Sequence, residues 1–333
     1  MSLRRKSPLS GAHVFRAALA LAAGVLPAAL IVLLAFLAVY SWPAIKFNGW
    51  RFLTGNTWNI GNLYADPVPM GKLMVQPGAQ FSIAFLIGGT LLTTLIAIAI
   101  ALPVGVASAL FLAEAVPGRV RSFVSFFVEL LAAVPSVVFG LWGYAVLIPF
   151  LGHHLFPLMT RHLGWLPYFR GDPGSGYGLL TAGLVLSLMI VPLISATVRD
   201  AILAQPTALR ESAAALGATR FETAWKVLLP GVRRVIFGAT ILALGRALGE
   251  TMAVLMVSGN ALGYLPRNIY SPVSTMAAFI ASQLDSALDD PSGLAVQSLA
   301  EIALVLAFIS LVVNAAARIV LAAATRSRRT SLA

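Results

Sequence analysis

Six apolar stretches constrain the fold of this 333-residue chain more than any other feature of its sequence. A helix needs roughly 20 consecutive apolar residues to cross a bilayer. Stretches of at least that length lie at Ala17–Tyr40, Phe81–Ala113, Phe123–Leu151, Tyr177–Val198, Val235–Val257 and Val296–Ala324. They lack the alternation of barrel strands, and backbone groups in lipid must pair within their own segment. The sequence therefore predicts an all-α integral membrane protein with six transmembrane helices.

The composition supports this class. Hydrophobic residues make up 59% of the chain and charged residues 11%, against roughly 25% charged residues in soluble domains. The chain has no cysteine, which excludes a disulfide framework and a thiolate metal site. The basic N-terminus imitates a signal peptide, but the apolar run Ala17–Tyr40 exceeds the usual length of about 7–15 residues. Ser41-Trp42-Pro43 is also a poor cleavage site, so an uncleaved first span is expected.

The distribution of lysine and arginine predicts the topology. Most of these residues fall before the first stretch, after the last one and between alternate pairs, which places both termini in the cytoplasm. The expected division is a cytoplasmic arm at 1–16, a first span at 17–40, a periplasmic loop at 41–80, a core of five spans at 81–324 with a cytoplasmic loop at 200–234, and a basic tail at 325–333. The net charge of +11 then reflects topology and anionic lipid, and not nucleic acid. Ser274–Leu288 is amphipathic and is expected to form an outer helix, along the surface or re-entering the membrane.

A polar, helix-prone insert interrupts the apolar chain between Asp200 and Arg234. Pro206 is placed to open a helix, Gly217 interrupts it, and Phe221–Trp225 continues as a second short helix. A helix–glycine–helix elbow presents a knob that a partner protein can approach closely. A surface helix lying on lipid headgroups is the alternative. The residues predicted to form the docking surface are Glu211, Gly217, Ala218, Thr219, Arg220 and Phe221.

Arg246 and Glu250 are ionisable residues inside the fifth apolar stretch. Arg246 lies about eleven residues from Val235, near the bilayer midplane at 1.5 Å per residue. A charge there faces protein or water, and the i, i+4 spacing allows the two side chains to pair. The pair either holds helices together or lines the path of an anionic solute, with Arg246 as the cation.

Other polar residues lie within or beside the spans, and most of them allow two interpretations of their role. Pro135 kinks the third stretch, and Ser136 either meets the solute or bonds to the backbone. Glu129 is a second intramembrane acid or a group near the cytoplasmic mouth, and packing roles are expected for Glu301 and Asn314. The three histidines at 153, 154 and 162 lack a carboxylate at ligand spacing, so they indicate an outside loop and no metal site.

The sequence contains no phosphate-binding loop of the Gly-x-x-x-x-Gly-Lys-Ser/Thr type, since Gly71-Lys72 is followed by Leu73 and lacks the earlier glycine. No pairing of a nucleophile with a base is visible either. The chain is therefore not expected to be an enzyme or to bind a cofactor itself, and any ATP with Mg²⁺ that drives its action would be bound by a separate polypeptide.

The segment Glu211–Pro230, ESAAALGATRFETAWKVLLP, resembles the EAA loop of bacterial ABC importer permeases. Ser212 replaces the first alanine of that pattern, and Val227 replaces its isoleucine. The stretches Gly89–Glu114, Val134–Gly143 and Leu244–Asn260 are similar to permeases of the phosphate-specific ABC importer, and more like its PstC than its PstA subunit. The resemblance covers about Phe81 to Asn260.

This resemblance implies a type I importer fold in the bacterial inner membrane. A PstA-like second permease would share the transport path, two PstB-like ATPases would bind the EAA loop, and a PstS-like periplasmic protein would deliver phosphate. Arg246 matches the arginine of the family's Gly-Arg-Ala-x-Gly-Glu-Thr stretch. Two alternatives stay open: the same machine with molybdate, sulfate or phosphonate as cargo, and an ion-coupled secondary transporter or a membrane scaffold, although no inverted repeat of spans is evident.

Overall fold

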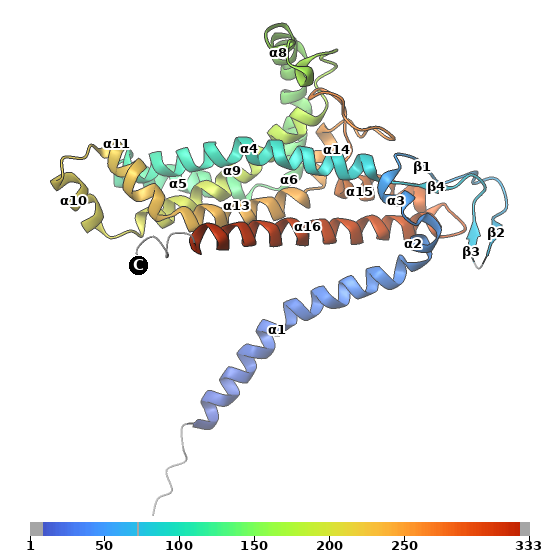
Figure 1. Cartoon of the computed structure of the whole chain (residues 1–333), viewed down its shortest axis with the longest axis horizontal. Coiled ribbons are helices and arrows are strands. Elements are labelled where there is room, and N and C mark those ends of the chain that lie inside the picture. The colour runs from blue at the N-terminus through green and yellow to red at the C-terminus, as the bar shows by residue number, and fades with distance from the viewer. Residues whose placement is uncertain (1–8, 72, 327–333) are drawn as a thin grey trace, which may run out of the picture.

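The computed structural model describes residues 9–71 and 73–326, so the basic residues Arg4, Arg5 and Lys6 and the tail from 327 lie outside the described residues. The described chain is mainly helical (Figure 1). Its helices are α1 (Leu9–Tyr40), α2 (Trp42–Asn48), α3 (Arg51–Thr54), α4 (Ala84–Glu114), α5 (Gly118–Ala133), α6 (Ser136–Trp142), α7 (Ile148–Phe150), α8 (Phe156–Leu163), α9 (Leu179–Leu203), α10 (Thr207–Ala215), α11 (Arg220–Thr223), α12 (Leu229–Gly231), α13 (Arg233–Leu248), α14 (Met252–Val257), α15 (Met276–Leu288) and α16 (Leu294–Arg326).

Short irregular helices and strands complete the fold. The π-helical turns are η1 (Gly143–Leu147), η2 (Leu151–Leu155) and η4 (Ala224–Leu228), and η3 (Pro167–Phe169) is a 3-10 turn. Strand β1 (Trp58–Asn59) pairs antiparallel with β4 (Gln80–Phe81), and β2 (Val68–Met70) pairs antiparallel with β3 (Leu73–Val75).

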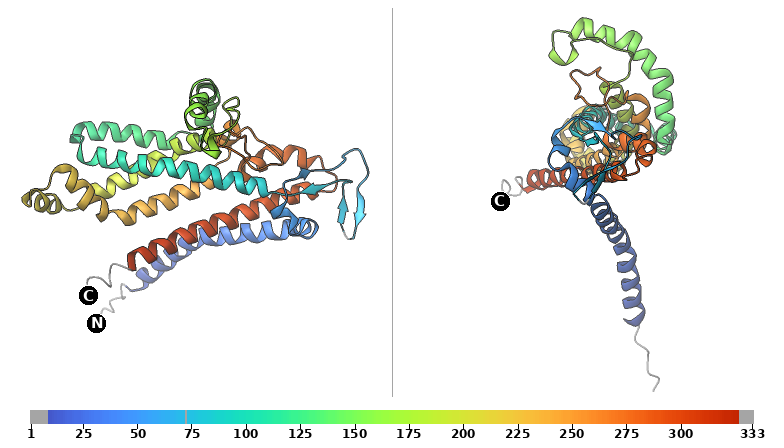
Figure 2. Two further views of the ribbon diagram at one scale, coloured as in Figure 1. Left: turned by 45° about the horizontal axis from the view of Figure 1, so that its top comes forward. Right: turned by 90° about the vertical axis from the view of Figure 1, so that its right-hand side faces the viewer.

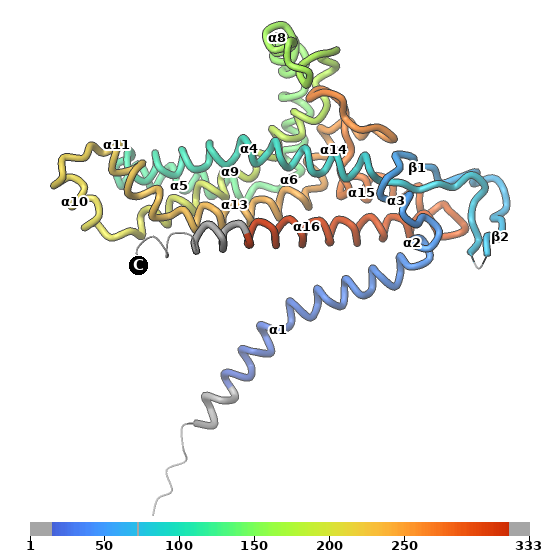
Figure 3. The backbone as a smooth tube through the Cα atoms, viewed as in Figure 1, coloured from blue at the N-terminus to red at the C-terminus, as the bar shows by residue number. Residues whose placement is uncertain are grey.

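The long helices α4, α9, α13 and α16 run side by side and form the body of the bundle (Figures 1 and 2). The strands lie at one end of this bundle, and α10 and α11 lie at the other. Helix α1 contacts α16 beside α2 and then diverges from the body, as the backbone trace in Figure 3 shows. The side chains of its apolar segment Phe15–Tyr40 are almost entirely uncovered in the single chain, as expected for a helix that contacts lipid or a partner.

Five helical runs in the described chain are long and apolar enough to cross a membrane. They are Phe15–Tyr40, Ala84–Glu114, Ser136–Leu163, Leu179–Leu203 and Leu294–Ile319. A sixth comes from the pair Arg220–Gly231 and Arg233–Leu248, which are bent by 66° at their junction. The prediction of a helical membrane protein is thus confirmed, and the predicted number of six spans is reached when the bent pair is counted as one span.

The third predicted stretch, Phe123–Leu151, is wrong as a single kinked span. Helix α5 ends at Ala133 and α6 begins at Ser136, because Val134 and Pro135 both adopt extended backbone, with ψ of 131° and 139°. The residue before a proline is disfavoured in the helical region, so the chain breaks here and does not merely bend. The run that starts at Ser136 continues to Leu163, well into the segment predicted to be an outside loop.

Helices α4 and α9 pack closely through a row of small residues. Ala97, Ala101, Gly105 and Ala109 recur every four residues along one face of α4 and are buried. They lie in one apolar core with large α9 side chains such as Leu186, Ile190 and Ile194. A Cβ on Gly105 would lie only 2.9 Å from the Ile194 side chain. Small residues at this spacing let two helix backbones approach, which is the usual packing device inside membranes.

The end of the bundle that carries the strands has its own core. The helix predicted at Ser274–Leu288 is present as α15, whose Phe279 is buried among Phe85, Trp58 and Phe81; its location on the outer side stays a prediction. The predicted loop at 41–80 is more ordered than expected, since it begins with α2 and α3. Here the Nδ2 group of Asn48 donates to Glu301 at 2.8 Å and to Ser298 at 3.3 Å, so Glu301 joins α2 to α16.

Candidate functional site: the elbow and its root

Residues Thr207–Leu228, comprising α10, α11 and η4, form a bent projection that we call the elbow. Helix α10 starts directly after Pro206, as predicted. It ends where Gly217 adopts φ +81°, a left-handed conformation that glycine accepts without steric cost. The amide of Ala218 then donates to the carbonyl of Ala213 at 3.0 Å, which closes the last turn. The predicted helix–glycine–helix geometry is confirmed.

The second half of the elbow begins with a capping box. The hydroxyl of Thr219 accepts a hydrogen bond from the amide of Glu222 at 3.2 Å, and the Glu222 carboxylate accepts one from the Thr219 amide at 3.0 Å. This reciprocal pair satisfies two free amides at the start of α11. Lys226 lies one turn further and bonds to Glu222 at 3.1 Å. The bend at Gly217 is thus fixed from both sides.

Large apolar side chains cover the tip of the elbow and face outward. Leu216 is 88% exposed, Phe221 is 72% exposed, and the ring of Phe221 stacks on that of Trp225 with centroids 6.4 Å apart. Glu211, Gly217, Thr219 and Arg220 are also exposed, and Ala218 is half-buried. An exposed apolar patch with a polar rim is typical of a protein or membrane contact surface.

An ion pair fastens the elbow to the end of α4. The guanidinium of Arg210 on α10 lies 2.8 Å from the carboxylate of Glu114, and both side chains are about three-quarters covered. The same guanidinium donates to the carbonyl of Ile202 at 3.1 Å. On the other side of the elbow, the Nε2 group of Gln205 donates to the carbonyl of Leu228 at 2.9 Å. These contacts join both arms of the elbow to the body of the bundle.

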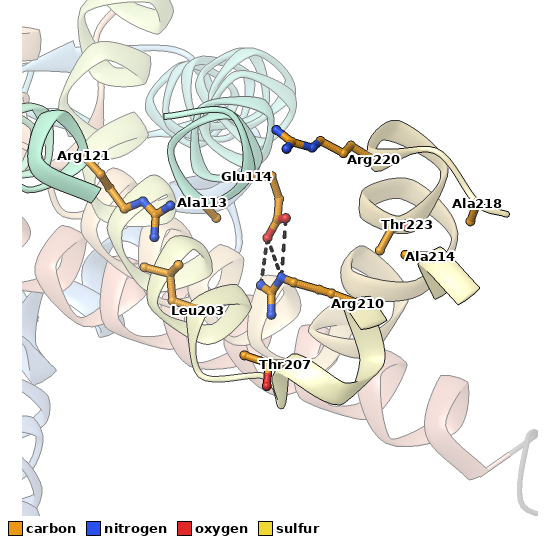
Figure 4. Close-up of a pocket in the computed structure, with 10 residues that line it drawn as sticks. All are labelled: Ala113, Glu114, Arg121, Leu203, Thr207, Arg210, Ala214, Ala218, Arg220 and Thr223. Carbon is orange, nitrogen blue, oxygen red and sulfur yellow. Dashed lines mark hydrogen bonds and ion pairs between the residues drawn. The ribbon is translucent and has the colours of Figure 1, made fainter. Parts of the chain in front are cut away.

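A polar cavity of about 560 Å³ lies between the elbow and the turn that joins α4 to α5. Figure 4 shows Arg121, Arg210 and Arg220 entering it from α5, α10 and α11, with Glu114 between them. One further cation lies deeper in the bundle. Arg199 is 6% exposed, and its Nη2 atom lies 2.9 Å from Glu129 and 2.7 Å from Asp200. Glu129 therefore links α5 to α9.

The expected pairing of Arg246 with Glu250 is wrong. Helix α13 ends at Leu248, so the two residues do not share a helix face. The Glu250 carboxylate instead accepts a hydrogen bond from the amide of Ala253 at 3.3 Å and caps the start of α14. Arg246, in the last turn of α13, is exposed and has no carboxylate partner among residues 9–71 and 73–326. Gly249, with backbone angles outside the helical region, ends the helix between them.

The structure places the third predicted path residue at a helix end. Ser136 is the first residue of α6 and is half-covered, in the single chain, at the break that follows Pro135. Behind it, α6 packs against α14, where a Cβ on Gly140 would lie 2.9 Å from the Cα of Ala253. A new helix follows each of the two breaks: α6 begins at Ser136, and α14 begins shortly after Leu248. These two helices contact each other.

Sequence reasoning did not identify the clamp between Arg210 and Glu114. Glu114 is the one acid that closes the second apolar stretch, and Arg210 precedes the EAA-like segment by one residue. Because one residue follows an apolar stretch and the other lies in the polar insert, the sequence indicates that both charges lie near the same membrane surface. The two residues are 96 positions apart in the sequence, so only the tertiary structure reveals their contact.

The histidines do not form a recognisable metal centre. His153 and His154 lie in the turn η2, and the His154 ring stacks on Phe150 with centroids 5.5 Å apart. Within the described ranges, no group of three or more His, Cys, Asp or Glu side chains is arranged to hold a metal ion.

Comparison with known proteins places this geometry in a family. The family described as "Binding-protein-dependent transport system inner membrane component" matches residues 101–330. "Phosphate transport system permease protein PstC 1" of Mycobacterium tuberculosis is 48% identical over 278 residues, covering 83% of this chain and 82% of the relative. PstC of Haemophilus influenzae is 38% identical over 296 residues, covering 88% and 87%.

Solved structures share the fold at lower sequence identity. A bacterial alginate ABC transporter, in complex with an alginate-bound periplasmic protein, has a TM-score of 0.52 at 19% identity, and the match covers 90% of this chain and 94% of that one. A second structure of an alginate importer has a TM-score of 0.51 at 18% identity, covering 71% and 77%. The chain belongs to the binding-protein-dependent transport system inner membrane components and, among them, to the PstC permease proteins.

Proposed function

We propose that this chain is one of two permease subunits of an ATP-driven phosphate importer in a bacterial inner membrane. A PstA-like permease would complete the transport path, PstB-like ATPases would bind ATP and Mg²⁺ and dock on the elbow, and a PstS-like periplasmic protein would deliver phosphate. The family membership supports the class of machine, and the names of the relatives support phosphate as the cargo. In this arrangement both termini and the elbow lie in the cytoplasm.

The observation that carries the coupling role is a braced elbow with an apolar tip. Leu216 and Phe221 offer uncovered surface of the kind that dominates protein interfaces. The clamp between Arg210 and Glu114 ties this tip to α4, which belongs to the core of the bundle. A displacement of the tip by an ATPase would therefore move α4 with it, and the bundle would alternate between outward and inward openings as rigid parts.

Arg246 is the proposed cation of the anion path, with Glu250 and Ser136 as further path residues. Phosphate carries one to two negative charges near neutral pH, and a guanidinium forms strong charge-assisted bonds to phosphate oxygens. Because the Glu250 carboxylate caps α14, Arg246 is left available for a solute or for the second permease. An ionisable residue within a membrane helix is by default a functional candidate.

Uptake of labelled phosphate in phosphate-starved cells that lack this chain tests the proposal. Wild type is expected to restore uptake, and Gly217→Asp is expected to abolish it together with ATPase association. No atom lies within 4 Å of a Cβ on Gly217, so the new carboxylate projects from the docking surface and leaves the interior unchanged. Gly78→Asp is the matched control, since Gly78 has the same φ of +81°, equally free space and a place at the other end of the bundle.

Three results would overturn parts of the proposal. Normal transport by Gly217→Asp would remove the coupling role of the elbow. Restoration of sulfate, molybdate or phosphonate uptake in place of phosphate uptake would mean the same machine with another cargo. Uptake that persists without ATP would indicate an ion-coupled secondary transporter. Separately, unchanged uptake by a normally assembled Arg246→Gln variant would remove Arg246 from the anion path.

A further inference from the structure

Two neighbouring cavities meet at the root of the elbow and share Glu114 and Arg220 in their walls. The first is the polar cavity of about 560 Å³ shown in Figure 4. The second is an apolar groove of about 920 Å³, with Val106 and Leu110 of α4 in one wall and Trp225 and Ile236 in the other. Each volume lies in the range of small-molecule sites.

The polar cavity carries an excess of positive charge. Arg121, Arg210 and Arg220 line it together with a single acid, Glu114, whose charge is already balanced by Arg210. Arg121 donates from Nη2 to the carbonyl of Val116 at 3.0 Å, while its Nε is buried and has no hydrogen-bond partner in the described chain. Neither Arg121 nor Arg220 has a carboxylate within ion-pair distance among the described residues. Two guanidinium groups are thus available for one anion.

The position of the cavities relates them to the membrane surface. Glu114 is the last residue of α4, the 31-residue apolar run long enough to cross a bilayer. The polar cavity therefore lies at the end of a candidate span. The groove follows the last turns of α4 from Leu102 to Phe111, within the same apolar run. A basic pocket continuous with an apolar groove matches a molecule that is anionic at one end and apolar at the other.

We propose that the two cavities together bind an anionic phospholipid. Its phosphate group lies between Arg121 and Arg220, and one acyl chain lies in the groove between α4 and the elbow. Arg220 and Trp225 belong to the elbow, whereas Arg121 and Val106 belong to α5 and α4, so the lipid joins the elbow to the bundle beside the ion pair of Arg210 and Glu114. This site is independent of the transported anion and does not rest on phosphate being the cargo.

Lipid titration by native mass spectrometry tests the site on the full chain, purified in detergent with its co-expressed partner subunits. The probe is dioleoyl-phosphatidylglycerol, and dioleoyl-phosphatidylcholine tests the need for net negative charge. Wild type is expected to retain phosphatidylglycerol in preference to phosphatidylcholine. Arg121→Gln/Arg220→Gln is expected to weaken phosphatidylglycerol binding by about thirtyfold, because each basic side chain at an anionic headgroup strengthens binding several-fold.

Two matched controls separate charge from general damage. Arg119→Gln removes a neighbouring exposed arginine that does not line the cavity, and it is expected to leave binding unchanged. Ala107→Trp fills the groove without changing any charge and is expected to lose binding, whereas Val104→Trp adds the same ring on α4 outside the groove and keeps it. The groove variant keeps the test valid if the double arginine variant fails to fold.

Three outcomes would overturn the proposal. One is equal binding of phosphatidylglycerol to wild type and to both the arginine and the groove variants. Another is displacement of the lipid by millimolar inorganic phosphate, which would identify a site for the free anion. The third is absence of phosphatidylglycerol from the wild-type complex together with a cross-link from Ala107→Cys to a partner subunit, which would mean that protein fills the groove.

Discussion

The carboxylate of Glu114 and the guanidinium of Arg210 lie 2.8 Å apart and join the end of α4 to the elbow. Both side chains are largely covered, so this contact is less screened than the pair of Lys226 and Glu222, whose side chains are 69% and 41% exposed. Two ion pairs of the same elbow thus differ in burial. The exposed pair of Lys226 and Glu222 can therefore serve as a control when the covered pair of Arg210 and Glu114 is tested for transmitting motion from the elbow to α4.

Glu114→Gln is expected to weaken the joint between the elbow and α4 by about 1–2 kcal/mol, because it replaces a charge-assisted bond with a neutral one. Phosphate uptake should fall while the subunit still assembles, and ATP hydrolysis in the purified importer should become less dependent on the binding protein. The charge swap Glu114→Arg/Arg210→Glu should recover part of the uptake. Lys226→Gln is the control, with an expected cost of about 0.5 kcal/mol or less. Equal losses in both variants would contradict a special role for the clamp.

The cluster around Arg199 predicts a non-additive loss of stability. Its buried guanidinium has two acidic partners, so Glu129→Gln or Asp200→Asn alone should have a modest effect on the melting temperature of the purified protein. The double variant leaves the covered Arg199 guanidinium without a charged partner and should cost about 0.5–3 kcal/mol more than the sum of the two single effects. Differential scanning fluorimetry in detergent measures all three. Additive single effects would show that Arg199 is adequately solvated without either acid.

Adjacent glycines of α4 offer a test of packing. A Cβ on Gly89 would collide with the backbone carbonyl of Ser274, which cannot move by itself, whereas a Cβ on Gly88 would meet only the tip of the Leu265 side chain. Gly89→Ala should therefore destabilise the protein by about 1–3 kcal/mol. Gly88→Ala should have a much smaller effect, since a terminal methyl group can rotate away. Equal melting temperatures for the two variants would argue against the close contact between α4 and the segment before α15.

Local patterns in the sequence sufficed to predict much of this fold. The helices α4 and α9 were predicted from the apolar stretches Phe81–Ala113 and Tyr177–Val198, although α9 continues past the second of these through two charged residues, and the turn at Gly217 follows from a glycine between two helix-forming segments. Each of these features depends on residues within a few positions of one another. The same holds for the start of α10 after Pro206.

The remaining differences arise where a helix ends inside a predicted span. Pro135 was expected to bend a span, but Val134 and Pro135 are both extended, so α5 ends there and α6 begins a new helix that packs on α14 through Gly140. Arg246 and Glu250 have the spacing of a helical ion pair, yet the helix ends at Leu248 and the carboxylate caps the next helix. Hydrophobic periodicity presupposes a continuous helix and does not reveal where that helix ends. The partner of Arg210 is likewise far away in the sequence.

The separation of Arg246 from Glu250 predicts that their roles can be uncoupled. Glu250→Ala removes the side chain that caps α14 and should lower stability by about 0.5–2 kcal/mol, as the loss of other capping side chains does, and for a path residue uptake should fall by more than the loss of folded protein. Arg246→Gln should leave the melting temperature unchanged, because the side chain is exposed in the single chain, and should reduce uptake if the guanidinium contacts the anion. Melting temperatures and phosphate uptake of both single variants and the double variant form a complete cycle. The effects of the two single variants on stability should add to within about 0.5 kcal/mol. A larger interaction energy would mean that the two side chains pair in the working transporter. The cap of α14 would then exist in only one conformation of the transporter.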